Sequence, residues 1–177
     1  MEINKVVETL LKIVGTDAVG FISGKIISPG VSGLTKLEEG RGSVYGLAVF
    51  IEKTEDLQKI YEDIPLEHKN STKLDDWKSI GDNYYPLYWG RDINFGARLY
   101  SHTKTVASTG TIQIDSINAL KDKTIIYGAI PCINQAKHES RVRETYKDIL
   151  KTIKGTKKDK TEEDFIRNLS QDEQHDF

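Results

Sequence analysis

The chain has 177 residues, of which 37% are hydrophobic and 29% charged, and this composition predicts one folded domain rather than a disordered chain. It contains no apolar run of the roughly 18 residues that cross a membrane, and its first residues lack a secretory pattern, so we expect no membrane partner. The single cysteine, Cys132, excludes an internal disulfide and favours a reducing, cytoplasmic location.

The formal net charge of -2 is distributed unevenly along the chain. Residues 161–177 hold six acidic residues and one arginine, whereas residues 84–160 hold 14 lysines and arginines against 7 acidic residues. We therefore expect a domain over 1–160 followed by an acidic tail over 161–177. The basic excess suits attraction to phosphates, although a solvated surface would show the same excess.

The first half of the chain predicts one helix, one strand and a long insertion. Apolar residues recur at helical spacing over 3–14, and six glycines over 20–42 indicate a loop with short extended pieces. Residues 43–51 are apolar on both faces, which is typical of a central strand. Residues 53–83 contain a short helix at 56–64 and a polar loop, and we interpret them as an insertion between the first two strands.

The second half predicts two further strands and two further helices. Residues 84–88 and 123–130 have strand patterns, 109–114 is short and β-prone, and 92–102 and 135–154 have helical patterns. The expected fold is therefore α/β in the broad sense (α+β). It has a small, mainly antiparallel three-stranded sheet flanked by helices.

Residues 88–102 (Tyr-Trp-Gly-Arg-Asp-Ile-Asn-Phe-Gly-Ala-Arg-Leu-Tyr-Ser-His) form the most informative segment. This segment resembles the signature of the GIY-YIG nucleases, in which a Tyr-Ile-Gly motif precedes a helix with the pattern Asn-Leu-x-x-Arg-Leu-x-x-His. Tyr88 begins the tyrosine motif, and Arg91 occupies the basic position that commonly follows it. Arg98 and His102 stand at the helix positions with the family's spacing, while Phe95 replaces the leucine.

The remaining family positions are matched more sparsely. Tyr45 stands where the first tyrosine motif would end, 43 residues before Tyr88, and this separation requires the insertion at 53–83. The family's metal-binding glutamate, on a later helix, corresponds to Glu139. No clear counterpart of the asparagine that many members have after that helix is found. The resemblance covers about residues 43–154.

The resemblance implies a Mg²⁺-dependent DNA endonuclease with a GIY-YIG-like fold. The implied catalytic residues are Tyr45, Tyr88, Arg98 and His102, the implied metal ligand is Glu139, and the implied DNA contacts are Arg91 and Lys104. Phosphodiester hydrolysis needs these residue types, because a guanidinium neutralises phosphate charge, a tyrosine positions or deprotonates water, and a carboxylate holds a hard cation.

Several alternatives stay open from the residues alone. Glu144 is the second candidate for the metal ligand. Glu139 lies nearer the apolar stripe of its helix, where burying a carboxylate is costly unless it binds a partner such as a metal ion. Either tyrosine is also a normal strand core residue. We expect a restriction-type enzyme acting as a homodimer, since both DNA strands must be cut. The alternative is a non-catalytic nucleic-acid-binding or interaction protein that keeps the fold.

Overall fold

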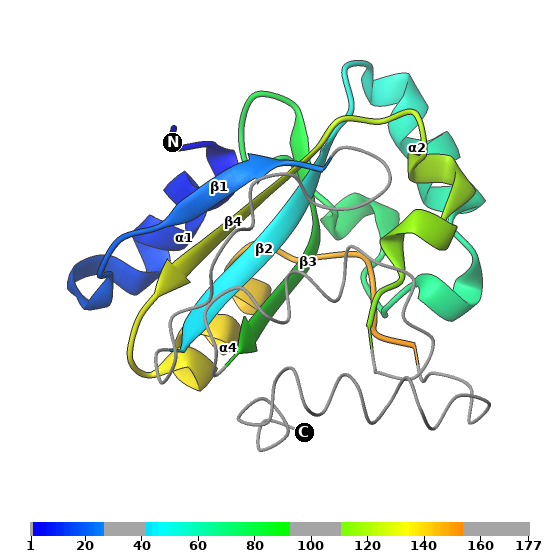
Figure 1. Ribbon diagram of the computed structural model, residues 1–177. Coiled ribbons are helices and arrows are strands. Elements are labelled where there is room, and N and C mark those ends of the chain that lie inside the picture. The colour runs from blue at the N-terminus through cyan, green and yellow to red at the C-terminus, as the bar shows by residue number, and fades with distance from the viewer. Residues whose placement is uncertain (1, 27–41, 93–110, 154–177) are drawn as a thin grey trace, which may run out of the picture.

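The computed structural model describes residues 2–26, 42–92 and 111–153 (Figure 1). Within these residues the chain forms a four-stranded antiparallel sheet in the order β1-β4-β2-β3. The strands are β1 (Ile22–Lys25), β2 (Ser43–Phe50), β3 (Tyr84–Asp92) and β4 (Ile125–Pro131). The expected central strand is confirmed as β2, which pairs with β3 on one side and β4 on the other.

One face of the sheet is covered by helices α1 (Lys5–Val14) and α4 (Gln135–Thr145) (Figure 1). The Asn4 side chain caps α1 by accepting the Val7 N–H, and Gly15 ends the helix with a positive φ of 60°. Buried aliphatic residues of α1 and Val142 of α4 pack against this face together with Trp89. Helix formation therefore follows the apolar stripe that the sequence shows.

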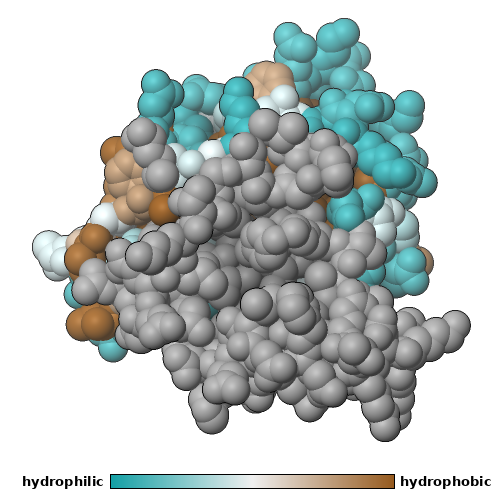
Figure 2. All heavy atoms as spheres, viewed as in Figure 1, coloured by the Kyte–Doolittle hydropathy of each residue, from teal (hydrophilic) through white to brown (hydrophobic). Residues whose placement is uncertain are grey.

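The other face carries the larger core cluster, which includes Tyr45, Leu47 and Tyr127. Toward one end it is covered by α2 (Thr54–Asp63) and by short 3-10 turns at Leu66–His68, Leu74–Asp76, Ile114–Ser116 and Asn118–Leu120. Much of the visible surface over α2 is hydrophilic (Figure 2). The insertion is thus a structured part of the core, in which Trp77 is buried and donates its indole N–H to the Pro86 carbonyl at 2.7 Å.

Three sequence-based expectations need correction. The sheet has a fourth strand, β1, which the expected three-stranded sheet lacked; its sequence Ile-Ser-Gly-Lys is short and has no alternating pattern. The last helix was expected to reach residue 154, but α4 ends at Thr145. Residues 109–114 were expected to be extended, but within the described part, 111–114, Thr111 forms an isolated bridge with Ile153 and Ile114 begins a 3-10 turn.

The reason for the early end of α4 lies in the backbone of β3. Ile149 and Leu150 both donate their N–H groups to the Leu87 carbonyl, at 3.2 and 2.9 Å. Leu87 lies at the irregularity in the β2–β3 pairing, so its carbonyl needs a partner outside the sheet.

Among the described residues, no helix is long and apolar enough to span a membrane.

Candidate functional site

The two signature tyrosines lie on neighbouring strands and on the same face of the sheet. Tyr45 of β2 pairs with Gly90 of β3, and Tyr88 of β3 pairs with Leu47 of β2. Their ring centroids are 6.3 Å apart with a 39° angle between the ring planes. The expectation that the first two signature strands are neighbours is confirmed. Tyr45 is buried with 1% of its surface exposed, whereas Tyr88 is partly exposed.

Gly90, the last residue of the Tyr-Trp-Gly motif, makes room for the Tyr45 ring. A Cβ atom at position 90 would lie closer than 3.0 Å to the Cζ and Oη atoms of Tyr45. Glycine is therefore required for a steric reason, and its motif position follows from where the Tyr45 ring lies. This close approach connects the two tyrosine motifs physically, although they are far apart in the sequence.

Beside Tyr88, charged side chains gather along β3, which is one of the two edge strands of the described sheet. We call this group the edge cluster and define it as Tyr88, Arg91, Glu139, Arg143 and Asp148. In it, Glu139 Oε2 lies 3.4 Å from Arg91 Nε, and Glu139 Oε1 lies 3.2 Å from Arg143 Nη1. The guanidinium carbon of Arg143 lies 4.9 Å from the Tyr88 ring centroid. Arg143 thus contacts both Glu139 and the ring of the second signature tyrosine.

Arg143 and Asp148 also satisfy backbone groups of β3. The Trp89 N–H donates to Asp148 Oδ2 at 2.9 Å, and Arg143 Nη2 donates to the Trp89 carbonyl. Asp148 Oδ1 accepts from Asn70 of the insertion at 2.8 Å. An edge strand has unpaired peptide N–H and C=O groups with which a strand of another chain could pair, and Arg143 and Asp148 cover these groups at Trp89. The cluster is consequently fixed to the sheet.

The charges of the cluster depend on one another. Burial of the Arg143 guanidinium opposes its charged form, but Asp148, Tyr88 and Glu139 more than offset this effect and raise the Arg143 pKa above its ordinary value. Burial also raises the pKa of the Asp148 carboxyl, against the opposing effects of Arg143, the Trp89 N–H and Asn70. Arg143 Nε lies 3.4 Å from Asp148 Oδ2 in an ion pair whose angle does not make a hydrogen bond.

The donor set fits a divalent cation only under one condition. The described residues contain no group of three or more His, Cys, Asp or Glu side chains placed to hold a metal. Mg²⁺, however, is often bound by one or two carboxylates together with waters and substrate phosphates. Glu139 would meet this requirement only with its two guanidinium partners displaced, because both of its oxygens are paired in this structure. Glu144, the second candidate ligand, is exposed on α4.

Three expected site residues lie outside the described residues, namely Arg98, His102 and Lys104. The expected helix over 92–102 lies there as well, apart from Asp92, which is the last residue of β3. The structure therefore brings together Tyr45, Tyr88, Glu139 and the expected DNA contact Arg91. These four come from β2, β3 and α4.

Sequence reasoning did not select Arg143, Asp148 or Asn70 for the site. Arg143 counted only toward the basic excess of residues 84–160, which a solvated surface would show as well. A usable signal did exist, because Arg143 follows Glu139 by four residues and so lies on the same face of a helix. Asp148 and Asn70 form a hydrogen bond although they are 78 residues apart in the sequence, and no local pattern predicts such a contact.

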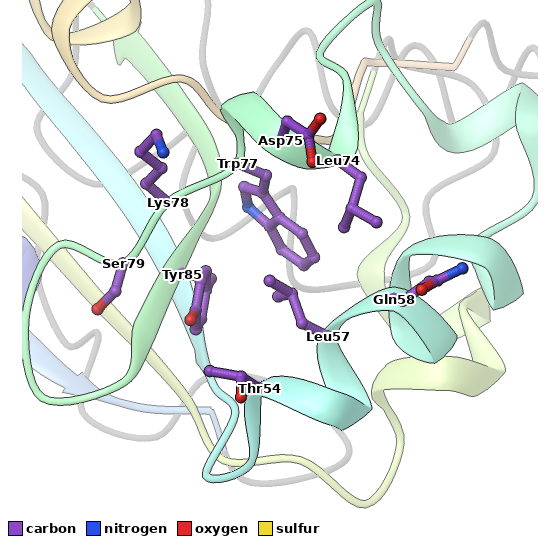
Figure 3. Close-up of a pocket in the computed structure, with 9 residues that line it drawn as sticks. All are labelled: Thr54, Leu57, Gln58, Leu74, Asp75, Trp77, Lys78, Ser79 and Tyr85. Carbon is purple, nitrogen blue, oxygen red and sulfur yellow. The ribbon is translucent and has the colours of Figure 1, made fainter.

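A pocket of about 400 Å³ lies between α2 and the following turns, lined by Trp77, Tyr85 and residues of the insertion (Figure 3). None of its lining residues belongs to the edge cluster. Trp77 and Tyr85 line it with little exposed surface, 1% and 7%. The pocket and the edge cluster are thus separate features of the domain.

No family model, curated protein or solved structure matches this chain. The likeness to the GIY-YIG nucleases consequently rests on the residues quoted above.

Proposed function

We propose that this chain is a divalent-metal-dependent DNA endonuclease of the restriction type. The observation that carries the proposal is the placement of Tyr45 and Tyr88 on one face of neighbouring strands, with their ring centroids 6.3 Å apart. Arg143 contacts the Tyr88 ring and forms an ion pair with Glu139. A tyrosine hydroxyl, a guanidinium and a carboxylate are the groups that phosphodiester hydrolysis needs.

Each residue has a defined task in this proposal. Tyr88, which is partly exposed, positions the attacking water or relays its proton, and Tyr45 holds the Tyr88 ring from the neighbouring strand. Arg91 and Lys104 bind DNA phosphates, Arg98 holds the scissile phosphate, and His102 contacts a neighbouring phosphate or helps a proton transfer. Glu139 holds Mg²⁺, which when bound offsets the negative charge that develops on the phosphate and the leaving oxygen.

The wider setting is proposed with the activity. Cutting both strands of a duplex requires two sites, so we propose a homodimer that acts on DNA in the cytoplasm. A single cysteine that is buried suits a reducing compartment. Sedimentation of the protein with and without DNA tests the dimer.

The second candidate function is nucleic-acid binding without cleavage. It is favoured by the two ion pairs of Glu139, because a carboxylate that has guanidinium partners on both oxygens neutralises phosphate-binding groups and is less available to a cation. A protein of this kind would retain the basic excess of residues 84–160 and would bind DNA in a salt-dependent way.

Relaxation of supercoiled plasmid separates the two functions. The endonuclease cuts the plasmid with Mg²⁺ but not with EDTA, and Arg98→Ala abolishes cutting while the protein stays folded. The non-catalytic protein retards the same plasmid in a gel at low salt and never cuts it. If the protein neither cuts nor binds DNA at low ionic strength, both candidates are wrong.

A further inference from the structure

The ion pairs of Glu139 determine what the edge cluster does when an anion arrives. Glu139 is the least exposed of the three partners, with 18% of its side chain accessible against 36% for Arg91 and 38% for Arg143. Both arginine side chains are therefore partly exposed while they hold the carboxylate, although the Nε atom of Arg143 is buried.

A phosphodiester competes with the carboxylate for these guanidiniums. Both anions present two oxygens to the planar fork of an arginine, so each can replace the other at the same donors. Arg143 stays in place during such an exchange, because the Trp89 carbonyl and Asp148 hold its Nη2 and Nε atoms, whereas Glu139 pairs with Nη1. The acceptor of Arg143 changes, and its position does not.

We propose that a DNA phosphodiester displaces Glu139 from Arg91 and Arg143, and that this exchange makes the phosphodiester and a divalent cation bind cooperatively at Glu139. The proposal rests on the nuclease function proposed above. Before exchange, the two guanidiniums repel a cation and occupy the carboxylate oxygens. After exchange, their charge is neutralised by phosphate, and the carboxylate no longer pairs with either guanidinium.

Because of this coupling, the protein without DNA binds little metal, and DNA binding promotes metal binding. By reciprocity, the carboxylate must weaken DNA binding when no metal is present, because it competes for the same arginines. Metal binding without DNA and DNA binding without metal can be measured separately. Each measurement has a control variant that removes a charge of the same sign from another position on α4.

The first measurement is Mn²⁺ binding to the full chain without DNA, followed by the electron paramagnetic resonance signal of free Mn²⁺. Arg91→Met and Arg143→Met should each bind Mn²⁺ at least about tenfold more tightly than the wild type, because each removes a cation beside Glu139. Arg141→Met, an exposed position on the same helix, should match the wild type. Adding Glu139→Gln to either variant should abolish the gain.

The second measurement is binding of a fluorescently labelled DNA duplex of mixed sequence in EDTA. Glu139→Gln should bind at least about threefold more tightly than Glu144→Gln, which removes the same charge from an exposed position of α4. If Arg143→Met fails to fold, Arg91→Met alone serves for the Mn²⁺ measurement described above, since Arg91 is not among the groups that cover the backbone of Trp89.

Equal Mn²⁺ affinities in the wild type and both arginine variants overturn the proposal, as does a gain in Arg141→Met of the same size. Equal duplex affinities of Glu139→Gln and Glu144→Gln overturn its DNA half. If these results arise while the wild type cuts plasmid with Mg²⁺, the exchange is wrong and the nuclease function stands. If the wild type neither binds nor cuts DNA, the nuclease function itself fails.

Discussion

Replacing Gly90 with alanine tests whether the packing of the two tyrosines matters for activity. The new Cβ would lie closer than 3.0 Å to the Cζ and Oη atoms of Tyr45, a distance that real Cβ contacts essentially never show. Tyr45 is 1% exposed and has no open space into which to turn, so its ring or the β2–β3 pair must shift by roughly 1 Å to restore ordinary contact.

The shift has a cost that can be estimated. Overpacking of a core site typically costs about 1–3 kcal/mol, and the reduced freedom of alanine in the unfolded chain returns about 0.4–1 kcal/mol. We expect a net loss of about 1–2 kcal/mol, which for a domain of this size lowers the melting temperature by about 2–8 °C. The variant therefore stays folded at 25 °C, while a displacement of about 1 Å reduces catalysis by about 100-fold.

The assay compares Gly90→Ala with Gly128→Ala, a matched change on β4. At position 128 the added Cβ would lie 2.7 Å from Val7 Cγ2, on the face that packs against α1 and away from the tyrosines. Both variants should melt earlier by similar amounts, but only Gly90→Ala should lose plasmid cleavage at 25 °C. Equal cleavage by the two variants, at equal folded fractions, would refute the role of the tyrosine packing.

Three further outcomes are expected. Tyr88→Phe keeps the ring and removes the hydroxyl, so plasmid cleavage should fall by about 100-fold or more in protein that stays folded at 25 °C; a normal rate would remove Tyr88 from the chemistry. Arg91→Ala should reduce the slope of log affinity for DNA against log salt by about 1, and an unchanged slope would show that Arg91 contacts no phosphate. Because burial raises the pKa of Asp148 above 3.8, the folded state binds the proton more tightly than the unfolded state. The free energy of unfolding of the wild type, relative to Asp148→Asn, should therefore fall as pH rises above 3.8, and urea titrations showing a rise would contradict this.

The elements that the sequence predicts correctly are those with strong local patterns. The strand at Ser43–Phe50 is apolar on both faces because helices and turns cover both sides of it, and α1 shows a clean stripe and a capping asparagine. β1 was missed because four residues with a serine and a glycine leave too short a pattern, and its strand conformation depends on pairing with β4.

The sequence selects the candidate site residues by their motif positions, which are also a local pattern. Tyr88 and Glu139 follow from motif positions, and their proximity is consistent with that reasoning. The arginine pairing of Glu139 requires knowledge of where α4 lies against β3, and the ending of α4 at Thr145 is set by backbone contacts of Ile149 and Leu150. Such non-local contacts leave no periodic signal in the sequence.

Cleavage of supercoiled plasmid by Glu139→Gln and Glu144→Gln, each with Mg²⁺ and beside the wild type, tests the central claim most directly. Both variants remove one negative charge from α4 and keep the side-chain size, but only Glu139 lies in the edge cluster beside Tyr88. The proposed site predicts that the wild type and Glu144→Gln cut with equal rates while Glu139→Gln does not cut. Normal cleavage by Glu139→Gln, in a preparation whose activity requires Mg²⁺, would contradict it.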